Sequence, residues 1–238
     1  MKKVKYEAVI FDFFGTLVPI YGLNTYNEMM SAMAGAVGVN SDFFADRWLD
    51  TFKERVTGQL PDVYANIMKI CSEVGASPTK EQCDVAIKIR LDYTKKNIFP
   101  KKDAIGTLAR IKKMGFGLGL ITDCSSELPG IWKETDFAPY FDVTLFSCIE
   151  GIKKPNPSIY RKAAALLRTT PEKCLYIGDG GSNELTGAKN VGMMPVLIFD
   201  EDEQGNPDSH RVDGQEWDGE VIYSLDDVLE LLHEGIKP

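Results

Sequence analysis

Apolar residues cluster in short continuous runs along the chain, and polar or glycine-rich segments separate the runs. A run of this length is typical of a strand that is buried on both faces of a sheet, because neighbouring side chains point to opposite faces. Five such runs are expected to form strands, at residues 8–13, 116–122, 143–147, 174–179 and 195–200.

Helical patterns lie between several of these runs. Residues 103–115 place their apolar side chains on one helical face and end in a glycine. A second helix is expected at residues 156–168, with Pro157 near its start, and a third at residues 224–235, with Ser224 as the N-cap. Strands that alternate with helices predict an α/β fold in which helices cover both faces of a parallel sheet.

Residues 19–99 depart from this alternation because they contain no strand-like run. They contain four helical patterns instead, and in the second pattern apolar side chains recur every four residues as far as Phe52 and Val56. The sequence therefore predicts an all-helical domain of residues 19–99 inserted into a core domain of residues 1–18 and 100–238. The four patterns cover residues 26–38, 41–56, 60–75 and 77–96.

The composition is ordinary for a globular protein. Of the 238 residues 44% are hydrophobic, but no apolar run approaches the roughly 20 residues of a membrane helix. The formal net charge of −8 argues against binding to nucleic acid, whereas a local positive pocket could still hold a small anionic substrate. The polar and acidic residues 200–220 are expected to form a surface loop.

Cysteine and histidine usage limits the compartment and the chemistry. The five cysteines form no CxxC pair, and the basic start of the chain has no signal-peptide cleavage site, so we expect a protein of the reducing cytoplasm. The only two histidines are His210 and His233, near the C-terminus, which disfavours a Ser-His-Asp triad or a histidine-rich zinc site. The groups that remain as candidates for catalysis are carboxylates, hydroxyls, lysines and a hard metal ion.

Polar residues follow three of the predicted strands at their carboxyl ends, where an open parallel sheet binds ligands. Asp12 follows the first strand, Thr122 and Asp123 the second, and Asp179 the fourth, while Lys154 lies in the segment GIKKPNP. An aspartate in the position of Asp12 can terminate a strand, cap a helix, or act as a nucleophile that forms a covalent intermediate. The strand pattern alone leaves these roles open.

The neighbours of these residues favour an anionic ligand. The turn at Gly15 and Thr16 would let the backbone curl around a bound group. Lys154 is either a solvated surface charge or a group that neutralises a transferring phosphoryl group. Asp179 and Glu184 flank a Gly-Gly turn, and two carboxylates close to Asp12 would suit Mg²⁺, although Glu184 is also favourable at a helix N-terminus.

Together, these segments resemble the four motifs of the haloacid dehalogenase-like (HAD) hydrolase superfamily over nearly the whole chain. DFFGTL is similar to the first motif, LITDCS to the second, GIKKPNPSIY to the third and GDGGSNEL to the fourth, and the helical insertion resembles the type 1 cap. The resemblance implies a Rossmann-like core and Mg²⁺-dependent phosphoryl transfer. It implies these roles: nucleophile for Asp12, phosphate-oxygen ligand for Thr122, charge stabilisation for Lys154, metal ligand for Asp179, and a direct or water-mediated metal contact for Glu184.

Three positions differ from the family pattern. Asp123 replaces the commoner asparagine, and Glu184 replaces an aspartate. Phe14 replaces the family's second aspartate, whose carbonyl binds Mg²⁺ and whose side chain is the general acid and base. Phenylalanine keeps the carbonyl but has no proton to give, and general acid–base catalysis typically contributes about 10²–10⁴-fold, roughly 3–5 kcal/mol of barrier.

We therefore favour a Mg²⁺-dependent phosphatase for a small phosphorylated metabolite whose leaving group needs little protonation, such as an acyl or aryl phosphate. The proton could instead come from Asp123, Lys53 or Arg55. Dehalogenation of 2-haloacids also needs no acid here, but dehalogenases usually carry a tyrosine in the first motif and lack the Gly-Asp metal pair. A phosphonatase-like enzyme with Lys53 as Schiff base, and a phosphate-binding module without turnover, are further alternatives. The sequence contains no indication of the oligomeric state.

Overall fold

The core of the protein is a single parallel sheet. The computed structural model describes residues 6–200 and 217–234. In these ranges six parallel strands are ordered β3-β2-β1-β4-β5-β6, which confirms the predicted α/β fold with its Rossmann-like core. The strands are β1 (Ala8–Phe11), β2 (Gly117–Thr122), β3 (Val143–Phe146), β4 (Cys174–Gly178), β5 (Met194–Ile198) and β6 (Glu220–Ile222).

The central strand β1 lies between β2 and β4, and its residues pair with both neighbours. Phe11 is in register with Leu120 on β2 and with Ile177 on β4. On one side of β1 the chain adds β2 and then β3. On the other side it adds β4, β5 and β6. The carboxyl ends of β1, β2 and β4 therefore lie together at the point where the strand order reverses, which is where open α/β sheets bind ligands.

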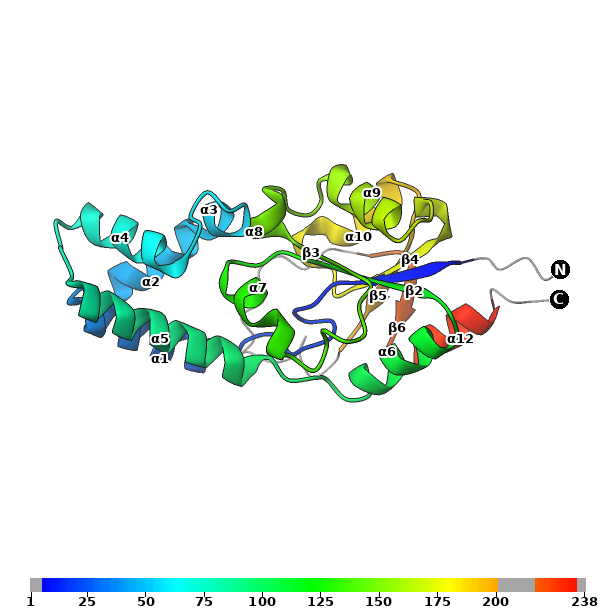
Figure 1. Ribbon diagram of the computed structural model, residues 1–238, viewed down its shortest axis with the longest axis horizontal. Helices are drawn as coiled ribbons and strands as arrows, with labels where there is room; N and C mark the ends of the chain where they lie inside the picture. The colour runs from blue at the N-terminus through cyan, green and yellow to red at the C-terminus, as the bar shows by residue number, and fades with distance from the viewer. Residues whose placement is uncertain (1–5, 201–216, 235–238) are drawn as a thin grey trace.

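Helices cover both faces of this sheet, as Figure 1 shows. Alternate residues of β1 enter different hydrophobic clusters: Phe11 packs with residues of α6 (Ala104–Lys113) and α12 (Asp227–Glu234), and Ile10 packs with residues of α9 (Pro157–Leu166) and α10 (Glu184–Asn190). This alternation explains why the strand reads as one continuous apolar run. The shorter helices are α7 (Glu127–Ile131) and α8 (Ser147–Glu150), with 3₁₀ turns at Trp132–Glu134, Pro171–Lys173 and Gly181–Asn183.

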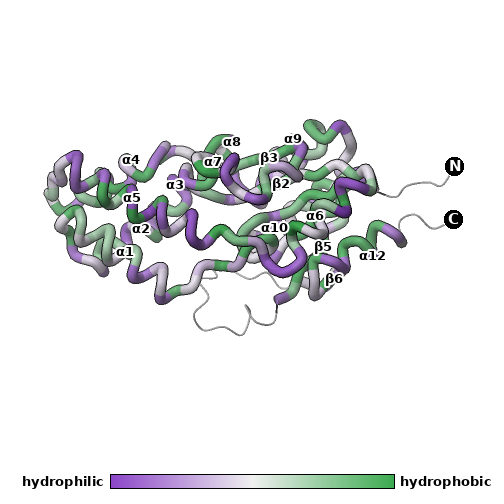
Figure 2. Tube along the Cα trace, turned by 60° about the horizontal axis from the view of Figure 1, so that its bottom comes forward, coloured by the Kyte–Doolittle hydropathy of each residue, from purple (hydrophilic) through white to green (hydrophobic). Residues whose placement is uncertain are grey.

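Five helices between β1 and α6 form a second body with its own hydrophobic cluster, at one end of the core in Figure 1. Figure 2 shows hydrophilic positions interspersed along these helices. Side chains fix several helix starts: Asn40 and Asp62 cap two of them, and Thr79 forms a capping box with Gln82. The helices are α1 (Leu23–Val37), α2 (Ser41–Asp50), α3 (Phe52–Val56), α4 (Val63–Glu73) and α5 (Lys80–Asn97). The domain boundaries at residues 18 and 100 stay a prediction.

The helical pattern predicted across residues 41–56 is interrupted at Thr51, where α2 ends and α3 begins. The Thr51 hydroxyl donates a hydrogen bond to the carbonyl of Trp48 at 2.9 Å. The four-residue spacing predicts that Phe52 and Val56 continue the buried face. Val56 is buried, but Phe52, which directly follows the break, is 44% exposed. Arg55 is buried instead.

The main chain after α3 packs closely on the core. Gly58 has a φ of +71°, and a Cβ atom at this position would lie 2.2 Å from the carbonyl oxygen of Cys148 on α8. A residue with a side chain would therefore force α3 away from α8.

The C-terminal part differs from the sequence prediction in two respects. The three-residue strand β6 was not predicted, because it has no apolar run and buries only Ile222. The last helix begins at Asp227, three residues after Ser224, and the Asp227 carboxylate accepts the Ser224 N–H at 2.9 Å, as the third helical residue does in a capping box. Residues 201–216 of the predicted surface loop lie outside the described residues. In the described ranges no helix combines the length and the apolar character needed to span a membrane.

Candidate active site

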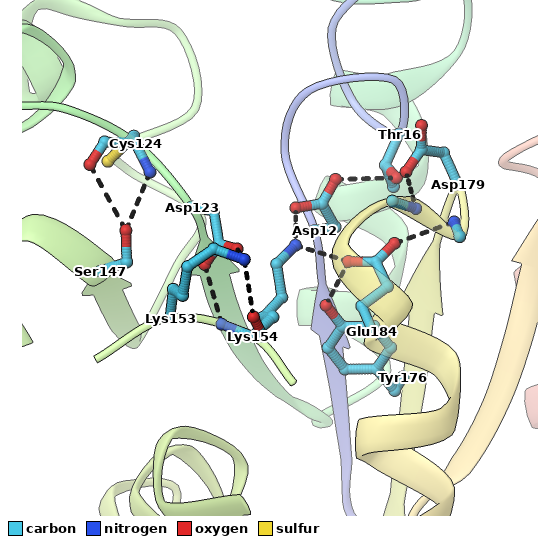
Figure 3. A network of polar contacts seen from close by, with 12 residues as sticks. Asp12, Thr16, Asp123, Cys124, Ser147, Lys153, Lys154, Tyr176, Asp179 and Glu184 are labelled. Atoms are coloured by element: carbon cyan, nitrogen blue, oxygen red, sulfur yellow. Dashed lines mark hydrogen bonds and ion pairs between the residues drawn. The ribbon is translucent and has the colours of Figure 1, made fainter. Parts of the chain in front are cut away.

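Asp12 lies directly after β1 and is 4% exposed. One of its carboxylate oxygens accepts a hydrogen bond from the Thr16 hydroxyl at 3.3 Å, and the other contacts the Nζ of Lys154 (Figure 3). The turn between Asp12 and Thr16 contains Gly15, with a φ of +82°, and a Cβ atom there would lie 2.4 Å from Oδ2 of Asp179. Glycine thus lets the loop after β1 reach the loop after β4.

Three carboxylates meet at this point, one from the loop after β1 and two from the segment that runs from the end of β4 to the first residue of α10. One oxygen from each of Asp12, Asp179 and Glu184 can be chosen so that all lie within 4.8 Å of one another, and all three residues are buried. Backbone N–H groups position two of these residues: Gly181 donates to Asp179 at 2.9 Å, and Gly180 donates to Glu184 at 3.0 Å. The structure thus brings together the three acidic residues that the sequence analysis singled out.

Lys154 joins the first and last members of this cluster. Its Nζ forms ion pairs with both Asp12 and Glu184. The Tyr176 hydroxyl donates a hydrogen bond to the same Glu184 carboxylate oxygen at 2.8 Å. Figure 3 shows the lysine between the two acids. A single ammonium group is therefore shared between two carboxylates from different parts of the core.

Burial dominates the protonation of this cluster. It raises the pKa of Asp12 to about 6, against the lowering effect of the Lys154 charge. Burial, together with the charge of Asp12, also raises the pKa of Glu184 well above its usual range. Burial alone would lower the pKa of Lys154, but the charges of Asp12 and Glu184 outweigh this effect and hold it high.

The donor set fits a hard divalent cation. Three carboxylates face one ammonium group, so that a further cation would favour the ionised form of the acids. In the described residues no donor is hydrogen-bonded to the carbonyl oxygen of Phe14, the remaining ligand predicted from the sequence. These oxygen groups are the kind that Mg²⁺ prefers.

The residues at the end of β2 have different environments. The Thr122 hydroxyl is buried and has no hydrogen-bond partner in the described part of the chain, so an oxygen of a bound group would satisfy it. One carboxylate oxygen of Asp123 accepts the backbone N–H of Lys154 at 3.0 Å, and the other lies 3.5 Å from Nζ of Lys153. Asp123 therefore holds the loop that carries Lys154.

A cavity of about 510 Å³ opens between these strand ends and the helical insertion. Asp12, Asp123 and Lys154 line it from the core, and Tyr21, Arg55 and Arg90 line it from the insertion. Across this boundary, Nε of Arg90 on α5 donates to Oε1 of Glu127 on α7 at 2.6 Å, in a buried ion pair. The cavity is large enough for a small metabolite.

A family model described as haloacid dehalogenase-like hydrolase matches residues 6–192. The chain belongs to this HAD hydrolase family. Its predicted membership is confirmed, and the protein is a hydrolase by family.

The proteins similar to this HAD hydrolase include two phosphatases and a dehalogenase. The glyceraldehyde 3-phosphate phosphatase of Methanopyrus kandleri is 28% identical over 197 residues, 81% of this chain and 83% of the relative. The phosphoserine phosphatase of Thermus thermophilus is 26% identical over 171 residues, 68% of this chain and 61% of the relative. The crystal structure of a 2-haloacid dehalogenase from Pseudomonas syringae pv. Tomato superposes with a TM-score of 0.70 at 21% identity, covering 96% and 99% of the two chains, a likeness of fold.

The first motif of this HAD hydrolase contributes an aromatic side chain, Phe14, to the cavity wall. The Phe14 ring packs edge-on against Phe13 at 5.1 Å and against Tyr21 at 5.3 Å between centroids, and it lines the cavity. Of the proposed substitute proton donors, Lys53 is exposed on α3 and does not line the cavity, whereas Arg55 does.

Several polar residues of the site were not found from the sequence of this HAD hydrolase. Tyr176 precedes Gly178 by two residues on β4, so that strand alternation places both on one face, beside Glu184. Glu184 is also held by the Tyr160 hydroxyl, which donates to its backbone carbonyl at 3.0 Å. The strand alternation could have revealed Tyr176, whereas the hydroxyl of Tyr160 gave no signal in a helical packing pattern.

Proposed function

We propose that this HAD hydrolase is a Mg²⁺-dependent phosphatase that acts on a small phosphorylated metabolite through an aspartyl-phosphate intermediate. The observation that carries the proposal is the meeting of Asp12, Lys154 and two further buried carboxylates at the end of a cavity. The phosphatase names of two relatives support it.

In this proposal the Asp12 carboxylate attacks phosphorus and displaces the leaving group. Lys154 balances the negative charge of the nucleophile and of the transferring group. The unpartnered hydroxyl of Thr122 donates to a phosphoryl oxygen, and the turn at Gly15 and Thr16 surrounds the group. Asp123 acts by holding the loop of Lys154 against the substrate.

The metal ligands in this proposal are Asp12, the carbonyl of Phe14, Asp179, and Glu184 directly or through water. When bound there, Mg²⁺ supplies charge neutralisation for the phosphoryl oxygens and the nucleophile. Residues 19–99 serve as the cap, because helices of this segment provide the wall opposite the strand ends.

Phe14 restricts the leaving group in this proposal. Its ring lies between Phe13 and Tyr21, and a phenyl ring cannot protonate a departing alkoxide. The loss of a general acid costs about 10²–10⁴-fold in rate. Acyl and aryl phosphates, whose leaving groups are weak bases, are therefore the favoured substrates.

The first test is turnover of p-nitrophenyl phosphate and acetyl phosphate with and without Mg²⁺. We expect activity to require the metal and to disappear in Asp12→Asn, with phosphate as the released product. Full activity in a chelator, or equal activity in the variant, would overturn the proposal. A parallel assay for halide release from 2-chloropropionate tests dehalogenase chemistry, which the carboxylates of Asp179 and Glu184 disfavour, because they repel an anionic substrate in the absence of a metal.

A further inference from the structure

Arg55 is a buried arginine in the cavity wall whose guanidinium group is only partly bonded. Arg55 is 5% exposed and lines the cavity. Its Nη1 donates to the carbonyl of Trp48 and, at 2.7 Å, to the hydroxyl of Thr51. In the described residues its Nε is buried without a partner, and no hydrogen bond or ion pair is formed by Nη2.

No carboxylate of the described residues forms an ion pair with Arg55. Glu127, an acid of the same cavity wall, accepts a hydrogen bond from Nε of Arg90 instead. The rings of Trp48 and Phe52, whose centroids lie 4.8 Å and 5.9 Å from the Arg55 guanidinium carbon, offer cation–π contacts. These contacts compensate only part of the loss of hydration that a buried cation suffers.

The cation persists at neutral pH. Burial lowers the pKa of Arg55 only to about 10, and the neighbouring charge of Arg90 contributes to the lowering. The charge of Glu127 acts favourably on Arg55 but forms no ion pair with it, so this buried cation in a cavity wall would be stabilised further by an anion from outside.

We propose that Arg55 binds a carboxylate of the substrate, remote from the phosphoryl group, so that the substrates of this site are phosphorylated carboxylic acids. The inference rests on the proposed phosphatase function. The Nη2 of Arg55 forms no hydrogen bond in the described residues and, unlike Nε, is not fully buried, so it can donate a charge-assisted hydrogen bond to a carboxylate oxygen in the cavity. The apolar side chains of Phe14, Tyr21 and Val56 line the same cavity and suit a carbon linker.

A matched pair of aryl phosphates tests this role without requiring a general acid. 4-Carboxyphenyl phosphate and 4-carbamoylphenyl phosphate have nearly the same shape and differ in the charge of the remote group. We expect the protein with Mg²⁺ to prefer the carboxylate compound in kcat/KM. Arg55→Met should lower the ratio of the two kcat/KM values about 10- to 100-fold, the range for a charge-assisted hydrogen bond, and Arg55→Lys should restore part of the ratio.

Arg47→Met is the matched control, because Arg47 is an arginine of the same insertion whose side chain is 41% exposed and pairs with Asp50. It should leave the substrate ratio unchanged. An equal loss for both substrates in Arg55→Met, or no preference of the unaltered protein, would overturn the role of Arg55 and leave the phosphatase proposal intact.

The two proposals fail separately. If neither aryl phosphate is hydrolysed in an Asp12-dependent manner, the phosphatase proposal fails, and calorimetric binding of the same two compounds to the unaltered protein then tests the carboxylate site. Equal dissociation constants would overturn it, and tighter binding of the carboxylate compound would support it. The same binding comparison on the unaltered protein decides the question if Arg55→Met does not fold.

Discussion

The cavity is bounded by two regions of opposite charge. At the strand ends, three buried carboxylates surround the ammonium group of Lys154. In the wall that the insertion forms, which we call the insertion wall, Arg55 and Arg90 are buried, and the carboxylate of Glu127 on α7 pairs with Arg90. The first region thus has room for a cation and the second for an anion, and a phosphorylated carboxylic acid bound with Mg²⁺ would supply both.

The two regions also differ in how completely their side chains are bonded. At the strand ends, Asp12, Lys154, Glu184 and Tyr176 form one hydrogen-bonded network, and the Thr122 hydroxyl is the buried group that remains without a partner in the described residues. The insertion wall contains guanidinium nitrogens of Arg55 and Arg90 that are buried without a partner. A bonded network positions reacting groups, whereas a guanidinium group with unsatisfied nitrogens gains from an added hydrogen-bond acceptor.

The largest expected effect is on the strand-end network. Lys154→Met leaves Asp12 and Glu184 without their shared cation, so we expect kcat for p-nitrophenyl phosphate to fall by about 10²–10³-fold. The free energy of unfolding of the metal-free protein should fall by about 3–5 kcal/mol, measured by urea titration. Lys153→Met, whose side chain is 27% exposed, is the control and should change both quantities much less. Equal effects of the two substitutions would contradict the central place of Lys154.

The ion pair across the insertion boundary should be the next most sensitive feature. Arg90→Met leaves Glu127 buried and charged, and we expect the free energy of unfolding to fall by about 3–5 kcal/mol. Adding Glu127→Leu removes the unpaired charge and should recover part of this loss, as urea titrations of both single variants and the double variant would reveal. Strictly additive losses would mean that the pair contributes no coupling across the boundary.

Metal binding should stabilise the folded protein through the strand-end carboxylates and not through other acids. At a Mg²⁺ concentration 100 times the dissociation constant, the free energy of unfolding should rise by about 2.7 kcal/mol, measured as a rise in Tm. Asp179→Asn should abolish most of this rise. Asp84→Asn, which alters an exposed acid on α5, should preserve it. A rise that persists in Asp179→Asn would place the ion elsewhere.

Phe14→Asp should have the smallest effect, because an introduced acid must replace a ring packed between Phe13 and Tyr21. We expect turnover of an alkyl phosphate such as glycerol 3-phosphate to rise about 10-fold, part of the range for a general acid. Acetyl phosphate turnover should rise less, because its leaving group needs little protonation. Phe14→Leu controls for the lost ring, and an equal response of both substrates would show that the missing proton is not what limits the rate.

The strand ends could be predicted from the sequence, and the insertion wall could not. Buried parallel strands have continuous apolar runs, so Asp12 and Asp179 stood out as the first charged residues after such runs. In the insertion, a four-residue spacing predicts burial of Phe52 and Val56, and only Val56 is buried; Phe52 directly follows the break at Thr51 and is exposed, whereas Arg55 is buried. A break between two short helices depends on tertiary packing, which periodicity does not encode.

The contact at Gly58 fixes the main chain of the insertion to the core three residues after Arg55. Gly58 follows Arg55 by three residues and approaches the carbonyl of Cys148 so closely that no side chain fits between them. Main-chain atoms, which cannot change rotamer, therefore hold the segment that follows Arg55 against α8. In the proposed role of Arg55, the site would select molecules by the separation of their two charged ends, and a homologous series of one, two or three linking carbons would be processed with a sharp optimum.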